Sequence, residues 1–174
     1  ELCLADASEK GYGYIEEIVK KYKVKDARIK YKHLGKNQGI SINSNEAAKM
    51  ASGEYITLLD HDDLLHPSAL YYVVKTIEED DAEFVYTDEL SFDRTPNKVQ
   101  SINFKPDFSW ETFRYNNFIC HLAAFKRKMF EDVGGFSKEC EGAQDYDLFF
   151  KLLEKTDKVI HIQKVLYYWR VYQA

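Results

Sequence analysis

The chain has 174 residues, 45% hydrophobic and 30% charged, which suits one globular domain over 1–174 and excludes disorder. Lys and Arg number 24 against 29 Asp and Glu, and the net charge of −5 argues against nucleic acid as a partner. No apolar run approaches a membrane span, and the 3 cysteines form no Cys-x-x-Cys pair, so we expect a cytoplasmic location.

Strand and helix signals alternate along the first half of the chain. Apolar or alternating runs predict strands at 2–5, 27–34, 55–59 and 83–87. Apolar residues at helical spacing predict helices at 12–22, 39–52 and 67–79. This alternation favours an α/β fold with a mainly parallel sheet that is covered by helices on both faces.

The second half is less regular. Residues 94–107 contain 2 of the 3 prolines and are expected to form a loop. Strands are predicted at 119–125, 159–162 and 165–171, and a helix at 143–155. The chain shows no internal repeat and no interdomain linker.

An acidic cluster follows the apolar strand that ends at Leu59. Asp60, Asp62 and Asp63 lie within one turn of that strand's carboxyl end, where open α/β sheets bind ligands. Such carboxylates repel one another unless a cation or solvent neutralises them, and Mg²⁺ is held by one or two carboxylates plus substrate phosphates. The pattern therefore predicts a metal–diphosphate site, with a solvated acidic turn as the alternative.

Two further segments carry candidate site residues. Asp145 falls in the first turn of a predicted helix, where the helix dipole favours a carboxylate that can act as a general base or simply as a cap. Asp147 faces elsewhere and is expected to be structural. Arg170 has the fork geometry that clamps a diphosphate, although an arginine stacked on Trp169 would look the same in the sequence.

Taken in order, these segments resemble the inverting nucleotide-sugar glycosyltransferases of family 2, which have the GT-A fold. The resemblance covers essentially the whole chain and is closest to bacterial members that build O-antigen, capsule and other cell-surface polysaccharides. It is carried by residues 4–6, 37–41 with Asn45, 51–56, 59–63, 86–89, 104–107, 134–136, 144–148, 161–162 and 165–170.

The resemblance implies a role for each candidate residue. Asp6 would contact the nucleotide base, Asp60 the ribose or sugar of the donor, and Asp62 an Mn²⁺ or Mg²⁺ ion that bridges the diphosphate. Arg170 would lie near that diphosphate, and Asp145 would deprotonate the acceptor hydroxyl. The donor would be a UDP-, dTDP- or GDP-sugar and the acceptor a glycan or lipid-linked molecule, with nucleotide binding in about 1–90 and acceptor binding in about 91–174.

The sequence departs from the family pattern at its front. The family opens with a strand and a helix that precede the strand at 2–5, so we expect an N-terminally truncated catalytic domain. The sequence leaves open whether the protein associates with the inner face of the plasma membrane through other segments. It also leaves open whether the chain forms a homo-oligomer. The rival functions are a nucleotidyltransferase and a non-catalytic sugar-binding or scaffold domain. Joint retention of Asp60, Asp62 and Asp145 favours an enzyme over the binding domain, which needs no base.

Overall fold

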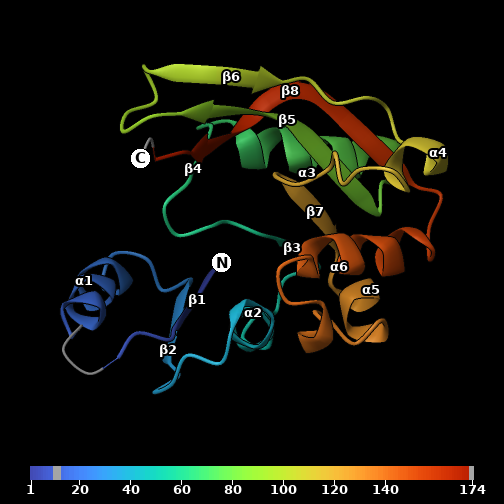
Figure 1. Ribbon diagram of the computed structural model, residues 1–174. Helices are drawn as coiled ribbons and strands as arrows, with labels where there is room; N and C mark the ends of the chain where they lie inside the picture. Colours follow the sequence, from blue (N-terminus) through green and yellow to red (C-terminus); the bar gives the residue numbers. More distant parts are fainter. Residues whose placement is uncertain (10–12, 173–174) are drawn as a thin grey trace. The chain divides into compact units, whose positions relative to one another are not determined.

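The computed structural model describes residues 1–9 and 13–172 and divides into two compact units (Figure 1). Unit 1 comprises Glu1–Glu54 and Phe130–Lys151, and unit 2 comprises Tyr55–Met129 and Leu152–Ala174. The chain therefore passes between the units three times. The expected functional division near residue 90 stays a prediction.

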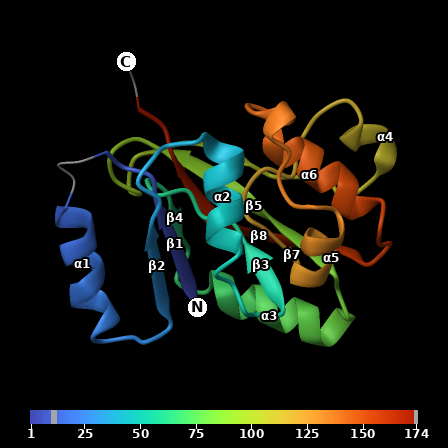
Figure 2. The same cartoon turned by 90° about the horizontal axis from the view of Figure 1, so that it is seen from below.

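Unit 1 is built around a parallel pair of strands that is flanked by helices. Its elements are β1 (Leu2–Asp6), α1 (Tyr14–Lys23), β2 (Ile29–His33), α2 (Ile40–Ala48) and the 3₁₀ helix η1 (Lys138–Cys140). Strand β1 pairs with β2 from Leu2↔Ile29 to Asp6↔His33. Figure 2 shows α1 beside β2 and α2 beside β1. The predicted βαβ order of this region is confirmed, except that the predicted helix start at Tyr12 lies outside the described residues.

Helix α2 depends on a residue far along the chain for its first turn. Gly39 precedes the helix with φ of 95°, a conformation that glycine adopts at little cost. The Glu141 carboxylate accepts hydrogen bonds from the backbone N–H groups of Ile40 and, at 3.2 Å, Ser41. These bonds satisfy donors that every helix leaves unpaired at its N-terminus. The Ser41 hydroxyl, followed by the backbone bonds from Ile40 and Ser41, lowers the pKa of Glu141.

Unit 2 is a six-stranded sheet with strand order β3-β7-β5-β8-β4, in which β6 also pairs with β5. Its elements are β3 (Tyr55–Thr57), β4 (Leu64–Leu65), α3 (Ala69–Asp80), β5 (Phe84–Phe92), β6 (Val99–Asn103), α4 (Trp110–Phe113), β7 (Ala123–Lys126) and β8 (Val159–Arg170). Helices α5 (Arg127–Asp132) and α6 (Gln144–Leu153) carry the chain across the boundary between the units.

The expectation of a mainly parallel sheet is wrong for unit 2. Only β5 and β8 are parallel there, whereas the β3–β7, β5–β7, β5–β6 and β4–β8 pairs are antiparallel. The predicted loop at 94–107 contains β6, and the two strands predicted at 159–171 form one strand, β8, with register shifts against β5 near Asp88. The alternation of strands and helices predicts parallel strands only where a helix connects two neighbouring strands, and it does not determine strand direction elsewhere.

The core of unit 2 lies between α3 and the sheet. Ala69 and Val73 of α3 are 0% and 5% exposed and pack with residues of β5 and β8. The other buried members of this cluster are Ala82, Val85, Leu122, Ala124, Ile162, Leu166 and Tyr167. This packing fixes the carboxyl end of β8, and with it Tyr167, beside the loop that follows β3.

Candidate functional site

The loop after β3 carries the predicted acidic cluster, and one of its carboxylates anchors it. Asp63 is 7% exposed and accepts hydrogen bonds from the Tyr167 hydroxyl at 2.6 Å and from the Arg170 backbone N–H at 2.7 Å. A turn bond from Asp63 N–H to the Asp60 carbonyl, 3.1 Å long, closes the loop. Asp63 is therefore committed to the fold, which leaves Asp60 and Asp62 for a ligand.

The side chain of Asp60 is 59% exposed, and its carboxylate lies 3.6 Å from Nε2 of His121. Its backbone N–H donates to the Tyr167 hydroxyl at 3.3 Å. Desolvation raises the pKa of Asp60; His121 opposes this rise, and repulsion from Asp63 and Asp62 adds to it. A cation at this loop would relieve that repulsion.

Arg170 holds the same loop from β8. Its Nε donates to the Asp62 carbonyl at 2.6 Å, and Nη1 donates to the Arg94 carbonyl at 2.6 Å. The guanidinium lies 4.6 Å from the ring centroid of Phe92, so it does not stack on Trp169 as one interpretation of the sequence allowed. The structure thus brings Asp60, Asp62 and Arg170 together within unit 2.

Among residues 1–9 and 13–172, no group of three or more His, Cys, Asp or Glu side chains is arranged to hold a metal ion. The acidic loop nevertheless leaves two carboxylates, those of Asp60 and Asp62, accessible to solvent. Asp62 is partly exposed, and Asp60 is close to it in the same turn. Two such carboxylates are the protein share of a Mg²⁺ site whose remaining ligands are phosphate oxygens and water.

Asp6 ends strand β1 in unit 1. Its carboxylate accepts hydrogen bonds from the Ser8 backbone N–H at 2.9 Å, from the Ser8 hydroxyl and from the Tyr31 hydroxyl at 2.7 Å. Burial raises the pKa of Asp6, but the bonds from Ser8 and Tyr31 outweigh it, so the pKa is lowered overall. The carboxylate is thereby kept ionised and oriented at the strand's carboxyl end.

Asp145 lies in the first turn of α6, also in unit 1, as predicted. Its Oδ1 accepts from the Tyr146 backbone N–H at 2.8 Å. Asp147 instead pairs with Lys151 at 2.8 Å, which agrees with the structural role expected for it. Asp6 and Asp145 are on separate elements of unit 1, and Asp60, Asp62 and Arg170 belong to unit 2.

A buried polar network on β5 was not predicted as functional. The Glu89 carboxylate is 5% exposed and accepts from Lys105 Nζ at 3.1 Å and from the His121 backbone N–H at 3.3 Å. The neighbouring Asp88 lies 2.9 Å from Nε2 of His161. The available signal was the continuation of an apolar strand, 83–87, into two carboxylates, because carboxylates are rarely buried unless they are paired.

Within the described part of the chain, none of the helices has the length and apolar character that crossing a membrane requires.

The chain has relatives among known protein families, curated proteins and solved structures. The sequence model of the family described as glycosyl transferase family 2 matches residues 4–134. An uncharacterized protein of Sinorhizobium fredii is 38% identical over 98% of the chain and 19% of its own length. The O-antigen biosynthesis protein RfbC of Myxococcus xanthus is 26% identical over 97% of the chain and 14% of its own length. The chain thus spans less than a fifth of these curated relatives.

Solved structures share the fold. S. aureus TarS 1–349 in complex with UDP-GlcNAc has a TM-score of 0.77 at 19% identity. The match covers 98% of the present chain and 50% of the TarS chain. The mannosyltransferase PcManGT of Pyrobaculum calidifontis, solved with GDP-Man and Mn²⁺, has a TM-score of 0.66 at 19% identity and matches 95% of the chain and 46% of its own. The fold is therefore the GT-A fold, and the chain belongs to glycosyl transferase family 2.

Proposed function

We propose that the chain is a catalytic domain that transfers a sugar from a nucleotide-diphosphate donor to a glycan or lipid-linked acceptor during cell-surface polysaccharide synthesis. The observation that carries this proposal is the loop after β3, where Asp63 is buried as an anchor and leaves Asp60 and Asp62 beside Arg170. A solvated acidic turn would need no such anchor. Membership of family 2 and the O-antigen relative support the reaction class and its setting.

Asp62 is the residue that would hold Mn²⁺ or Mg²⁺ together with the donor diphosphate, and Asp60 would contact the ribose or sugar of the donor. When bound, the cation neutralises charge that develops on the leaving nucleoside diphosphate. Arg170 would help to neutralise the negative charge of the diphosphate, since a guanidinium can donate two parallel hydrogen bonds to phosphate oxygens. The Mn²⁺ in the PcManGT complex supports a divalent cation, and the sugar nucleotides in the two neighbours support a UDP- or GDP-linked donor, with dTDP as the third candidate.

Asp145 would act as the general base. It would take the proton of an acceptor hydroxyl while that oxygen forms a bond to the anomeric carbon and the bond from this carbon to the diphosphate breaks. A single displacement of this kind inverts the anomeric configuration. Asp6, held by Ser8 and Tyr31, would accept a hydrogen bond from the nucleotide base. We propose that the reaction takes place in the cytoplasm; association with the inner face of the plasma membrane through other segments stays open.

A thermal titration tests the donor site. The chain is heated with UDP, dTDP and GDP, each with and without Mn²⁺, and the same series is repeated on Asp62→Asn. A nucleotide at a hundred times its dissociation constant should add about 2.7 kcal/mol to the free energy of unfolding. We expect a Mn²⁺-dependent rise with at least one nucleotide, lost in Asp62→Asn and kept in the control Asp157→Asn, whose carboxylate is exposed. A rise that survives Asp62→Asn would remove Asp62 from the metal site.

A further inference from the structure

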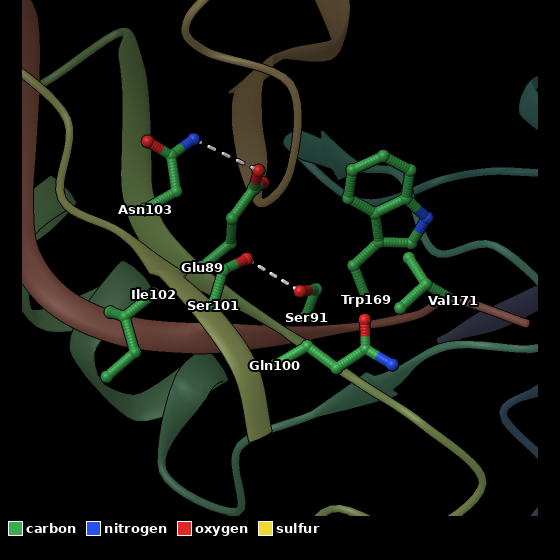
Figure 3. Close-up of a pocket in the computed structure, with 8 residues that line it drawn as sticks. All are labelled: Glu89, Ser91, Gln100, Ser101, Ile102, Asn103, Trp169 and Val171. Atoms are coloured by element: carbon green, nitrogen blue, oxygen red, sulfur yellow. Dashed lines mark hydrogen bonds between the residues drawn. The ribbon is translucent and has the colours of Figure 1, made fainter. Parts of the chain in front are cut away.

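A pocket of about 440 Å³ opens on one face of the sheet in unit 2 (Figure 3). Its size falls within the usual range of small-molecule sites, about 300–1,000 Å³. Its walls come from β5, β6 and the end of β8. The lining residues are Glu89, Ser91, Gln100, Ser101, Ile102, Asn103, Trp169 and Val171.

The strand register explains why these side chains share a face. Ser91 of β5 is paired with Ser101 of β6 and with Trp169 of β8. Two residues back, Glu89 is paired with Asn103 and with Tyr167. Because side chains alternate along a strand, these rows point to the same side of the sheet. Figure 3 shows the Ser91–Ser101 and Glu89–Asn103 hydrogen bonds across the pocket wall, 2.7 and 3.2 Å long.

Hydrogen bonds from buried groups fix the orientation of Glu89 in the pocket wall. Glu89 is fixed by the buried Lys105 ammonium at 3.1 Å and by the His121 backbone N–H at 3.3 Å. Its second oxygen accepts from Asn103 Nδ2, which leaves the Asn103 carbonyl oxygen for a ligand. A polar group whose orientation is set before binding loses little entropy when it binds.

The chemistry of the lining excludes phosphate and favours a neutral sugar. Among the described residues that line the pocket none is Lys or Arg, and the charge of Glu89 is paired with Lys105, so the lining offers no cationic side chain to a diphosphate. Trp169 is 47% exposed and offers an indole face on which the C–H side of a pyranose ring can pack. Gln100, Asn103 and Ser91 offer amide and hydroxyl groups for sugar hydroxyls.

We propose that this pocket binds a sugar ring of the acceptor glycan, an inference that rests on the proposed function. One feature favours the acceptor over the donor sugar, and a second connects the pocket to the proposed donor loop. The pocket is bordered by the edge strand β6, all of whose residues are exposed, so a longer glycan can leave along it. The pocket wall is linked to the acidic loop through one residue: Glu89 is paired on β8 with Tyr167, whose hydroxyl accepts a hydrogen bond from the Asp60 backbone N–H.

The 2 tryptophans of the chain allow a direct test. The protein is labelled with ¹⁵N at the indole nitrogen, and Trp169→Phe assigns the two resonances. Methyl glycosides of glucose, galactose, mannose, N-acetylglucosamine and N-acetylgalactosamine are then titrated without nucleotide. At least one should shift the Trp169 resonance saturably and leave Trp110 unchanged. Gln100→Ala should raise the Kd at least fivefold, whereas Gln163→Ala, an exposed glutamine of β8 outside the pocket, should not change it.

Three outcomes would overturn the inference: no saturable shift at the highest soluble concentration of any glycoside, an equal shift of Trp110, or a Trp169 shift caused only by complete sugar nucleotides. The last outcome would assign the pocket to the donor sugar. A parallel thermal titration with nucleotide and Mn²⁺ separates this inference from the proposed function. Nucleotide binding with a silent Trp169 refutes the pocket alone, and a responsive Trp169 without nucleotide binding refutes the donor site alone.

Discussion

Removal of the Tyr167 hydroxyl should destabilise unit 2 through the acidic loop. This side chain is 0% exposed, and its hydroxyl donates to Asp63 at 2.6 Å and accepts from the Asp60 backbone N–H at 3.3 Å. In Tyr167→Phe the buried Asp63 carboxylate keeps the Arg170 N–H but loses one of its two bonds. A hydrogen bond to a charged group is worth about 1.5–3 kcal/mol, so we expect a loss of about 2 kcal/mol.

The measurement is urea unfolding at neutral pH, supported by a thermal scan. For a chain of this size each kcal/mol lowers Tm by about 2–4 °C, which gives a fall of about 4–8 °C. Tyr115→Phe is the matched control, because Tyr115 is 93% exposed and its variant should stay within about 0.5 kcal/mol of the natural chain. If Tyr167→Phe also stays within that limit, Asp63 does not anchor the loop as described.

Three further predictions concern the proposed base Asp145, the carboxylate of Asp6 and the buried Lys105–Glu89 pair. Asp145→Asn should abolish sugar transfer in a turnover assay and leave the nucleotide-dependent rise in Tm intact; retained turnover would remove Asp145 as the base. Tyr31→Phe should raise the pKa of Asp6 toward its ordinary 3.8 in a ¹³C carboxyl NMR titration. Because the pKa of Asp6 is lowered in the folded chain, the ionised carboxylate stabilises the fold at pH values above its ordinary pKa, and this stabilisation is lost as the pH falls. The variant has less of it to lose, so its acid stability differs less from that of a chain with an ordinary Asp6. An unchanged pKa of Asp6 in Tyr31→Phe would contradict this reasoning. Lys105→Met should cost about 3–5 kcal/mol in urea unfolding, since it leaves Glu89 buried without its cation, and Lys105→Met with Glu89→Gln should recover part of the loss; equal losses would show that the pair is not coupled.

Much of the fold was predictable because periodicity reports burial. The helices at 14–23, 40–48 and 69–80 and the strand that starts at 84 all lie where apolar spacing placed them. Strand β6 was missed since all its residues are exposed, so an edge strand of this kind leaves no apolar pattern. Strand direction in unit 2 was also missed, because periodicity carries no information about direction.

The candidate site, like the fold, was predictable from the sequence only in part. The sequence located the acidic loop, but it does not reveal that Asp63 rather than Asp60 or Asp62 is the anchor. That choice depends on Tyr167, 104 residues away in the chain. The pairing of Lys105 with Glu89 was hidden for a similar reason, since a lysine beside a proline in an expected loop looks exposed. Long-range contacts therefore decide which polar residues serve the fold and which remain for a ligand.

Sugar transfer from a nucleotide donor is the reaction proposed for the chain. The most direct measurement is release of nucleoside diphosphate from UDP-, dTDP- and GDP-sugars in the presence of Mn²⁺ and an extract of cell-envelope glycans as acceptor. We expect release from one donor class, dependent on both Mn²⁺ and the acceptor, and loss of that release in Asp62→Asn and in Asp145→Asn. Release that is unaffected by both substitutions, or no release from any donor by a chain that binds nucleotide, would contradict it.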